Sequence, residues 1–447
     1  MTGLTRQLAD FVAGVAYDGI PAEAVATVKR GFIDCVGVMF AGRDEPVVRI
    51  LKEFVLSAPG GESKILYDQG QTTSPEAALL NATAGHALDY DDVAINGHPS
   101  VVLVPAVLAE GERLRASGRE LIAAYVAGYE TWGELASRDA DKHHAKGWHP
   151  SAVFGAVAAA AAGARLAKLD AGRTVHALAA AASMAGGLTA NFGSMMKPLQ
   201  VARAAQGGLL AARLAAKGFT ASPDALEHRG GFLHAFSPAG RVRADGALAA
   251  GKDWHILKHG LSIKRYPVCY ALHRSIDGLL ALREKFAGGE IREIELSIGN
   301  LQAGLLRHSR PQSALDAKFS AEFAAASAVV AGRVGLAELS DPFVRSAPVQ
   351  QMLPKVRVRT TDEVDPDEPI FAPSDRVRVT LADGTVLAGE PVRRALGHAH
   401  NPLGMDGLRA KFADCVGAAL ASARRDALFE RLRALETLPE AAALYNI

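Results

Sequence analysis

The segment SAVFGAVAAAAAGARLA, residues 151–167, decides the class of fold that this chain can adopt. Alanine has the highest helix propensity, so the segment predicts a helix. A second segment of the same kind, VHALAAAASMAGGL, covers residues 175–188. Both are short and rich in alanine and glycine rather than leucine, whereas a membrane span needs about 20 mainly apolar residues. We therefore expect buried helices that pack at close range, and no membrane span.

The residues before this segment also carry helical signals. Pro21 and the pair Ser74-Pro75 mark helix starts, because proline is favoured in the first turn of a helix. Ser117 and Glu120 have the spacing of a capping box. No strand-like alternation occurs before about residue 290, so the chain is expected to begin as an all-α domain. Apolar residues lie on one face of the first expected helix: Leu4, Leu8, Phe11, Val12 and Val15.

The pattern changes in the last third of the chain. Apolar and polar residues alternate in REIELSIG (292–299), VRVRT (356–360) and VRVTLADGTVLAG (377–389), and Asp383-Gly384 suits a hairpin turn. A helical piece (319–332) lies between them, and helical periodicity returns after Pro402. The expected fold is mainly α. A large all-α domain spans 1–265, with 403–447 packing back onto it, and a smaller α+β lid domain spans 266–402.

Charge and cysteine content limit the possible partners. The 49 basic and 48 acidic residues leave a net charge of +1, so no global field attracts nucleic acid or an anionic membrane. Three widely spaced cysteines make a disulfide framework or zinc knuckle improbable and suit a reducing cytoplasm. The N-terminal residues, with Arg6 and Asp10 in an amphipathic pattern, do not resemble a signal peptide. We expect a cytoplasmic protein that binds neither nucleic acid nor membrane.

Basic residues precede the alanine-rich helices. His98-Pro99, His149-Pro150 and Lys197-Pro198 each stand at an expected helix start, and Lys264 begins the stretch KRYP near the domain border. A basic side chain at a helix N-terminus adds to the free amides and the positive end of the dipole, which favours an anion site. Basic residues precede proline about as often as chance predicts, so only convergence in space would make these residues a site.

The stretch HALDYDDVAINGHPS, residues 86–100, contains three neighbouring aspartates, Asp89, Asp91 and Asp92. The repulsion between these carboxylates and the nearby helix C-terminus both raise a carboxyl pKa. A carboxylate with a raised pKa is a better proton acceptor. A solvated turn and a metal site are the alternatives. The chain has no His-Asp dipeptide, no HExxH and no EF-hand spacing, and it also lacks GxGxxG, GxxxxGK[ST] and GxSxG. A substrate site with a strong carboxylate is favoured, and no metal is expected.

Six segments, taken in order, resemble the MmgE/PrpD family, which includes 2-methylcitrate dehydratase, cis-aconitate decarboxylase and iminodisuccinate epimerase. The resemblance covers nearly the whole chain, and YPVCYALH and GWH are most similar to the epimerase branch. It implies a homodimeric enzyme without cofactor, whose active site lies between a helical domain and an α+β domain. The segments are HALDYDD, GHPS, GWHPSAVFGAVAAAA, NFGSMMKPLQVARAAQGGLLAA, IKRYPVCYALHRSID and DAKFSAEF.

The resemblance also implies the site residues and the chemistry, which is removal of a proton next to a carboxylate of a di- or tricarboxylate. Lys197 and Lys264 would clamp substrate carboxylates. His98 and His149 would be the acid and base, and Asp89 would orient a histidine or accept the proton. The expected additional substrate contacts are Asp92, Met195, Tyr266, Cys269 and His273, with Cys269 as a possible second acid or base that His273 activates.

Three positions depart from the decarboxylase pattern as the resemblance gives it. Val93 stands in place of a threonine, Cys269 in place of a histidine, and Phe323 in place of a tyrosine. These departures favour epimerisation or dehydration over decarboxylation of cis-aconitate. Two other classes remain open from the residues alone, a metal-dependent helical hydrolase and a helical binding protein without activity.

Overall fold

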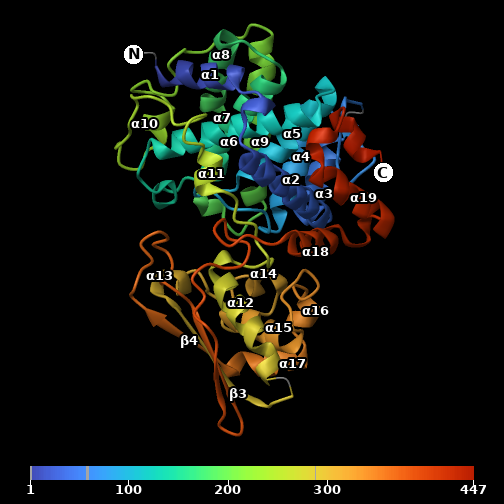
Figure 1. The fold of residues 1–447 in the computed structure, drawn as a ribbon, viewed down its shortest axis with the longest axis vertical. Helices are drawn as coiled ribbons and strands as arrows, with labels where there is room; N and C mark the ends of the chain where they lie inside the picture. Colours follow the sequence, from blue (N-terminus) through green and yellow to red (C-terminus); the bar gives the residue numbers. More distant parts are fainter. Residues whose placement is uncertain (1–2, 57–59, 287, 447) are drawn as a thin grey trace. The chain divides into compact units, whose positions relative to one another are not determined.

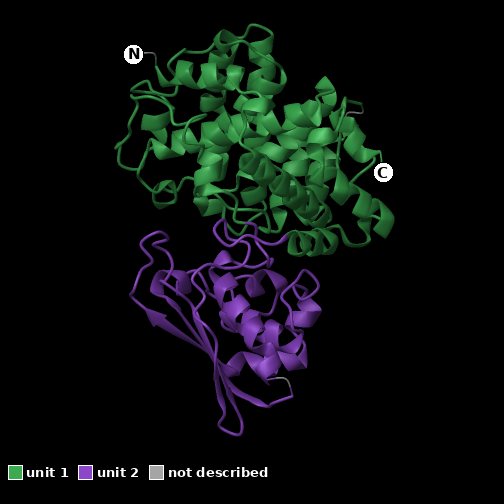
Figure 2. Ribbon diagram, in the orientation of Figure 1, with its two compact units in different colours: residues 1–262, 405–447 green, residues 263–404 purple. Residues whose placement is uncertain are grey.

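The computed structural model describes residues 3–56, 60–286 and 288–446. Contacts divide the chain into two compact units, which Figure 2 shows in different colours. Unit 1 consists of residues 1–262 and 405–447, and unit 2 of residues 263–404. Unit 1 is helical and unit 2 combines a sheet with short helices, so the expected mainly-α fold is confirmed.

Unit 1 is built around α7 (Pro150–Leu166), the helix that the alanine-rich segment forms. Its residues are almost all buried, and α5, α6, α8 and α9 pack against it (Figure 1). Gly208 of α9 allows this packing, because an added Cβ would lie 2.5 Å from the carbonyl oxygen of Ala156. The longer helices of unit 1 are α1 (Leu4–Gly14), α2 (Ala22–Gly42), α3 (Pro46–Val55), α4 (Ser74–Ala87), α5 (Pro99–Leu114), α6 (Gly118–Ser137), α7, α8 (Ala171–Met184), α9 (Met196–Ala216), α18 (Met405–Val416) and α19 (Ser422–Arg433), with α10 (Phe232–Phe236) and α11 (His255–His259) as single turns.

Sequence signals for helix starts are confirmed. Proline occupies the first turn of α4, α5 and α7. Ser117 and Glu120 form the expected capping box at the start of α6. Among the described residues, no helix combines the length and apolar character that crossing a bilayer requires.

One expectation about unit 1 was wrong. The chain forms a small antiparallel pair, β1 (Ser63–Lys64) with β2 (Gln71–Thr72), well before residue 290. Strands of two residues are too short to show the alternation that identifies a strand in sequence. The pair packs against α4 and α5 without changing the helical character of the unit.

The C-terminal helix α18 packs against α2 within unit 1. Lys411 of α18 forms an ion pair with Asp34 of α2 at 2.5 Å, and both side chains are almost completely buried. The same ammonium donates to the carbonyl oxygen of Tyr90 at 2.8 Å and lies over the Tyr90 ring. Lys411 therefore holds the loop that carries the three aspartates.

We expect Lys411→Met to lower the free energy of unfolding by about 3–5 kcal/mol, because it leaves a buried carboxylate at Asp34 without its partner. Urea unfolding followed by circular dichroism measures the change. Lys29→Met is the matched control, since Lys29 pairs with Glu436 where both side chains are partly exposed. The control should cost less than about 1 kcal/mol, and equal losses in the two variants would contradict the prediction.

Unit 2 contains a four-stranded sheet in the order β4-β3-β5-β6. The strands are β3 (Ile291–Gly299), β4 (Val356–Thr361), β5 (Arg376–Leu381) and β6 (Val386–Ala388), and β3 runs parallel to β4 and antiparallel to β5. All three strand segments predicted from alternation are present, and Gly384 turns the β5–β6 hairpin at φ 90°. The short helices are α12 (His273–Leu282), α13 (Asn300–Ala303), α14 (Ala314–Ala317), α15 (Ala321–Val330), α16 (Asp341–Val344) and α17 (Ala347–Met352).

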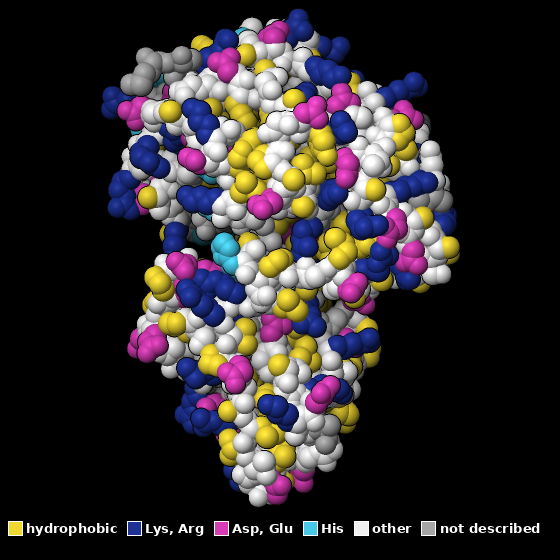
Figure 3. Space-filling model, viewed as in Figure 1, with side chains coloured by type: hydrophobic (Ala, Val, Ile, Leu, Met, Phe, Trp, Pro, Cys, Tyr) yellow, Lys and Arg dark blue, Asp and Glu magenta, His cyan; other side chains and the backbone are white. Residues whose placement is uncertain are grey.

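The core of unit 2 lies between the sheet and the helices α12 and α15 (Figure 1). Ile294 and Leu296 of β3 face Ile276 and Leu279 of α12 in this core. Phe323 belongs to a second small apolar cluster and is completely buried. On the face drawn in Figure 3, basic and acidic side chains are interspersed over each unit, in keeping with the net charge of +1.

Candidate active site

Three helix N-termini meet in unit 1, and each carries one of the basic residues singled out in the sequence. His98 is the N-cap of α5, His149 is the N-cap of α7, and Lys197 is the second residue of α9. The hydroxyl of Ser151 accepts a hydrogen bond from the backbone N–H of His98 at 3.1 Å, which ties the starts of α5 and α7 together. The positive ends of three helix dipoles therefore point to one place, which suits an anionic ligand.

The loop between α4 and α5 brings the carboxylates to these helix ends. Asp89 follows Leu88, the C-cap of α4, and has a positive φ of 53°, a left-handed conformation that often ends a helix. Aspartate tolerates this conformation better than most residues, because its short polar side chain can bond locally. The turn at Asp89 ends the helix, so its carboxylate lies outside α4. Residues held in such conformations occur often at functional sites.

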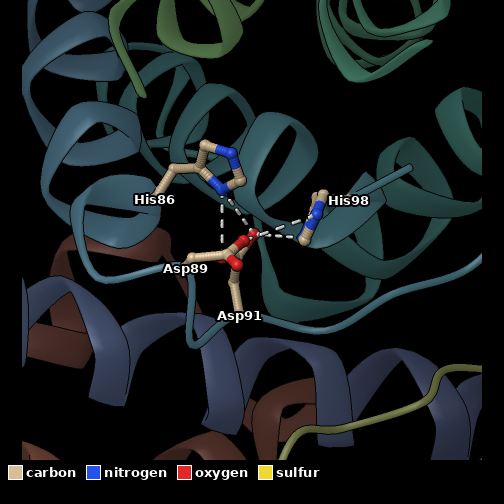
Figure 4. A group of neighbouring side chains, drawn as sticks. All are labelled: His86, Asp89, Asp91 and His98. Atoms are coloured by element: carbon tan, nitrogen blue, oxygen red, sulfur yellow. Dashed lines mark hydrogen bonds and ion pairs between the residues drawn. The ribbon is translucent and has the colours of Figure 1, made fainter. Parts of the chain in front are cut away.

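The side chains of this loop form a compact cluster, shown in Figure 4. Nε2 of His98 lies 3.8 Å from Oδ1 of Asp89, and Nδ1 of His98 lies 3.0 Å from Oδ2 of Asp91. On the other side of Asp91, Nδ1 of His86 lies 3.0 Å from both carboxylate oxygens. The ammonium of Lys197 donates to Oδ1 of Asp89 at 2.8 Å.

Exposure changes across the cluster. The side chains of His86 and Asp91 are completely buried, that of His98 is 14% exposed, and those of Lys197 and Asp89 are 19% and 27% exposed. The buried pair therefore forms the back of the cluster, and the Lys197–Asp89 pair its accessible side. A ligand would meet Lys197, Asp89 and Nε2 of His98.

His149 lies beside the cluster, near His86 and Phe192. Its ring lies 6.0 Å from that of His86 and packs edge-on to Phe192, and the ammonium of Lys197 lies over the same Phe192 ring. The side-chain amide of Gln200 donates to Nδ1 of His149 at 2.8 Å. The amide oxygen of Gln200 accepts from the backbone N–H of Leu188, which fixes the amide orientation.

This arrangement decides the state of His149. Because Nδ1 accepts a hydrogen bond, the single proton of the neutral ring must lie on Nε2. Burial, and to a lesser extent the neighbouring His86, His98 and Lys197, lowers the pKa of His149 to about 2. His149 is therefore a neutral hydrogen-bond donor at working pH rather than a base.

Burial also governs the other buried groups of the cluster. Burial lowers the pKa of His86 to about 4, Lys197 adds to the effect, and Asp91 opposes it. Burial alone would raise the pKa of Asp91, but the neighbouring His86 and His98 outweigh it and hold that pKa well below its usual range. At neutral pH, His86 is uncharged and Asp91 is an anion.

His86, Asp89, Asp91 and His98 each offer a ligand atom, and these atoms lie within 4.8 Å of one another, a spacing that also suits a metal ion. The donor set does not fit a cation well. Asp89 already receives the ammonium of Lys197, and both oxygens of Asp91 face a histidine nitrogen. A divalent ion would have to displace these donors and lie beside a fixed positive charge. The carboxylates of the cluster are already paired with the donors of Lys197, His86 and His98, which suits acid–base chemistry better than metal binding.

Asp92 was expected to contact the substrate. It is completely buried and accepts from the backbone N–H of Ser100, in the first turn of α5, at 3.4 Å. Burial and the neighbouring carboxylate of Asp34 raise its pKa well above the usual range. Asp92 therefore stabilises the start of α5 from inside the unit, and its role as a substrate contact stays a prediction. Met195, the N-cap of α9, stands two residues before Lys197 and is 51% exposed.

Four predicted residues belong to unit 2. Lys264 and Tyr266 are buried, and the hydroxyl of Tyr266 donates to Asp277 at 2.7 Å. Cys269 is partly buried, and its backbone N–H donates to the carbonyl oxygen of Lys318. His273 is completely buried against the rings of Tyr266 and Tyr270. Their catalytic and binding roles stay predictions.

Sequence reasoning missed four contributors to the site, His86, Asp91, Gln200 and Phe192. His86 and Asp91 stand in the same stretch as Asp89, and the signal in the sequence was a histidine five residues before an aspartate. The burial of both side chains is known only from the structure. Gln200 lies one turn after Lys197 on α9, and no local pattern distinguishes it. Its role depends on contacts with His149 and Leu188.

The pKa values of His86 and His149 predict how stability depends on pH. An unfolded histidine binds its proton near pH 6.5, whereas the folded residues do so at about 4 and about 2. The unfolded state binds more protons in between, so the free energy of unfolding falls as pH falls from 6.5 to about 4. We expect a slope of about 1.4 kcal/mol per pH unit for each histidine.

Urea unfolding at a series of pH values measures this slope. His149→Gln should reduce the slope by about 1.4 kcal/mol per pH unit, the contribution of one proton. His228→Gln, at an exposed position, should leave it unchanged. An equal slope in the wild type and in His149→Gln would show that His149 is protonated in the folded protein.

Comparison with known proteins agrees with this architecture. The model of the MmgE/PrpD N-terminal domain matches residues 6–244, and that of the MmgE/PrpD C-terminal domain matches residues 266–435. Three curated relatives are each named cis-aconitate decarboxylase. The mouse protein is 27% identical over 100% of this chain and 93% of its own length. The human protein is 25% identical over 100% and 95%, and that of Aspergillus terreus strain NIH 2624 is 26% identical over 100% and 96%.

The two domain models together span most of the described chain, and the three relatives align along all of it. The matched N-terminal domain contains the cluster around Asp89 and all three helix starts. The chain belongs to the MmgE/PrpD family.

Proposed function

We propose that this protein is a lyase or isomerase that acts on a small di- or tricarboxylate by moving a proton at a carbon next to a carboxylate, without a cofactor. The observation that carries the proposal is the convergence of Lys197, His98 and His149 around Asp89 at three helix N-termini. Similarity to tricarboxylate lyases along the whole chain supports the same class of substrate.

The difficulty of the reaction is the charge that develops when a bond to carbon breaks next to a carboxylate. Lys197 supplies one fixed positive charge on the accessible side of the cluster, and its ammonium keeps further N–H donors beyond the one given to Asp89. The N-termini of α5, α7 and α9 add their partial positive charges. Groups held in place in this way stabilise developing charge without reorganisation.

The two histidines take different parts in this proposal. Nε2 of His98, directed at Asp89, takes or returns the proton. Nε2–H of His149 donates a hydrogen bond to the oxygen on which charge develops, because its ring stays neutral. A second clamp at Lys264 rests on the family resemblance alone.

Three outcomes use these groups. In a dehydration the proton leaves carbon and a neighbouring hydroxyl leaves with a proton as water. In an epimerisation the proton returns to the opposite face. In a decarboxylation carbon dioxide leaves and the carbon takes up a proton. The names of the relatives favour a lyase, and the departures at Val93, Cys269 and Phe323 favour dehydration or epimerisation over loss of carbon dioxide.

A substrate panel in heavy water tests the proposal. 2-Methylcitrate, citrate, cis-aconitate and iminodisuccinate are incubated with the protein, and NMR follows deuterium uptake at carbon and the product. We expect exchange and turnover with at least one of them, unchanged after treatment with a chelator. A folded protein that neither exchanges nor converts any polycarboxylate would overturn the proposal, and loss of activity with chelator would indicate a metal enzyme.

The proposed homodimer can be measured separately. Multi-angle light scattering of the purified protein gives its mass, and twice the chain mass of 46.8 kDa is expected.

A further inference from the structure

Asp91 lies in the middle of a chain of three side chains, His86, Asp91 and His98 (Figure 4). We infer that Asp91 is a positioning residue, held by His86, which fixes His98 with its proton on Nδ1 and directs Nε2 of His98 to Asp89. The part that His98 then plays in catalysis rests on the proposed function. The arrangement of protons itself follows from geometry and can be measured without any substrate.

The first step concerns His86. Its ring is completely buried, and Nδ1 lies 3.0 Å from both oxygens of Asp91. Nε2 has no hydrogen-bond partner in the described part of the chain. A neutral imidazole carries one proton, and an ionised carboxylate only accepts hydrogen bonds. The proton of His86 must therefore lie on Nδ1, where it binds Asp91.

The second step concerns Asp91. The side chain is completely buried, so bulk water does not solvate its charge. Its charge is stabilised by His86 on one side and by His98 on the other. Because the His86 hydrogen bond holds the carboxylate from α4, the side chain cannot turn away from His98 without leaving His86 unpaired. Such a buried network has few alternative arrangements.

The third step concerns His98. Nδ1 of His98 lies 3.0 Å from Oδ2 of Asp91, within ion-pair distance, although the ring is not fully aligned for a hydrogen bond. Catalytic hydrogen bonds are often loose before substrate binds and tighten in the complex. Two lone pairs at this distance would repel, so Nδ1 carries the proton. Nε2 of the neutral ring is then left as a base, 3.8 Å from Asp89 on the accessible side.

The consequence is a division of roles between Asp91 and Asp89. Asp91 fixes the tautomer of His98 from the buried side, whereas Asp89 and Lys197 face its reactive nitrogen. Loss of the Asp91 charge should therefore randomise the tautomer of His98. The titratable groups around the His98 ring are Asp89 and His86 of α4 and its following loop, Asp91 of the same loop, His144 and His149 near the start of α7, and Lys197 of α9.

The tautomer can be read directly by NMR. Protein labelled with 15N at the histidine rings is recorded in a long-range 1H–15N correlation spectrum, and comparison with His98→Gln identifies the signals of His98. In the wild type we expect His98 with Nδ1 protonated and Nε2 bare at a pH where the ring is neutral. A proton on Nε2 in the wild type would overturn the inference, and this measurement requires no change at Asp91.

Asp91→Asn tests the cause. The amide has a similar shape but no charge, so we expect His98 to lose its preference for the Nδ1–H tautomer. Asp139→Asn is the matched control, because Asp139 is buried and faces His143 at 3.5 Å outside the cluster. The control should leave the His98 signals unchanged. An unchanged His98 tautomer in folded Asp91→Asn would also overturn the inference.

Kinetics give a second readout once a substrate is known. Asp91→Asn should lower kcat by about 10²-fold to 10⁴-fold, the range that a positioned acid or base contributes, with a smaller change in KM. A change confined to KM, with kcat unchanged, would assign Asp91 a structural role only.

The two failures are distinguishable. If no polycarboxylate is converted but the tautomer follows Asp91, the positioning role stands and the proposed function fails. If a polycarboxylate is converted but the tautomer does not follow Asp91, the function stands and the positioning role fails.

Discussion

We expect Lys197→Met to lower kcat/KM by about 10²-fold to 10³-fold, the loss typical of removing one fixed group that stabilises a transition state. Methionine has a similar length and leaves the apolar contact with Phe192 available, so the start of α9 should stay folded. The ammonium that donates to Asp89 is lost, and with it the positive charge on the accessible side of the cluster. Steady-state kinetics with the substrate found in the panel measures the change.

A control variant on the same helix separates this loss from a general effect on α9. Lys217→Met, at the exposed C-terminal end of α9, is the matched control and should behave as the wild type. Near-normal turnover in Lys197→Met would exclude Lys197 as the clamp.

His149→Gln should lower kcat by about 10²-fold to 10³-fold, the cost of losing one positioned donor to developing charge. The pH profile should keep its shape, because His149 has a pKa of about 2 and does not titrate in the working range. A lower kcat with an unchanged profile would identify His149 as a neutral donor rather than a base. Both effects are measured by kcat and kcat/KM over a series of pH values.

His228→Gln is the control for this substitution, since it changes an exposed histidine of the same unit. If His149→Gln removes a limb of the profile, then His149 titrates during turnover. The assignment of His149 as a neutral donor held by Gln200 would then be wrong.

Local patterns were enough for the elements of the fold. The helix starts at Pro99 and Pro150, the strand at 291–299 and the hairpin turn at Gly384 each follow from a few neighbouring residues. These signals act within one or two turns of chain, so no tertiary contact is needed to recognise them. The strands β1 and β2 were not predicted, because two residues are too few to show an alternating pattern.

Some residues of the candidate site were identified from the sequence, and others only from the structure. The sequence placed His98, His149 and Lys197 at helix starts, and the family resemblance implied that these residues and Asp89 belong to the site. It gave no reason to separate Asp91 from Asp92, which stand next to each other in the chain. Tertiary structure decides between them, since Asp91 is bound by His86 and His98, whereas Asp92 faces Ser100 inside the unit.

The sequence by itself therefore determined the helical class, the strands of unit 2 and which basic residues stand at helix starts, because backbone propensity and periodicity are local. Only the tertiary structure decided that α5, α7 and α9 begin at one place and that Gln200 and Asp91 set the protons of His149 and His98. Those contacts join residues up to about a hundred positions apart, such as Asp89 and Lys197 at a separation of 108. They depend on close helix packing, which Gly208 permits, and on the left-handed turn at Asp89.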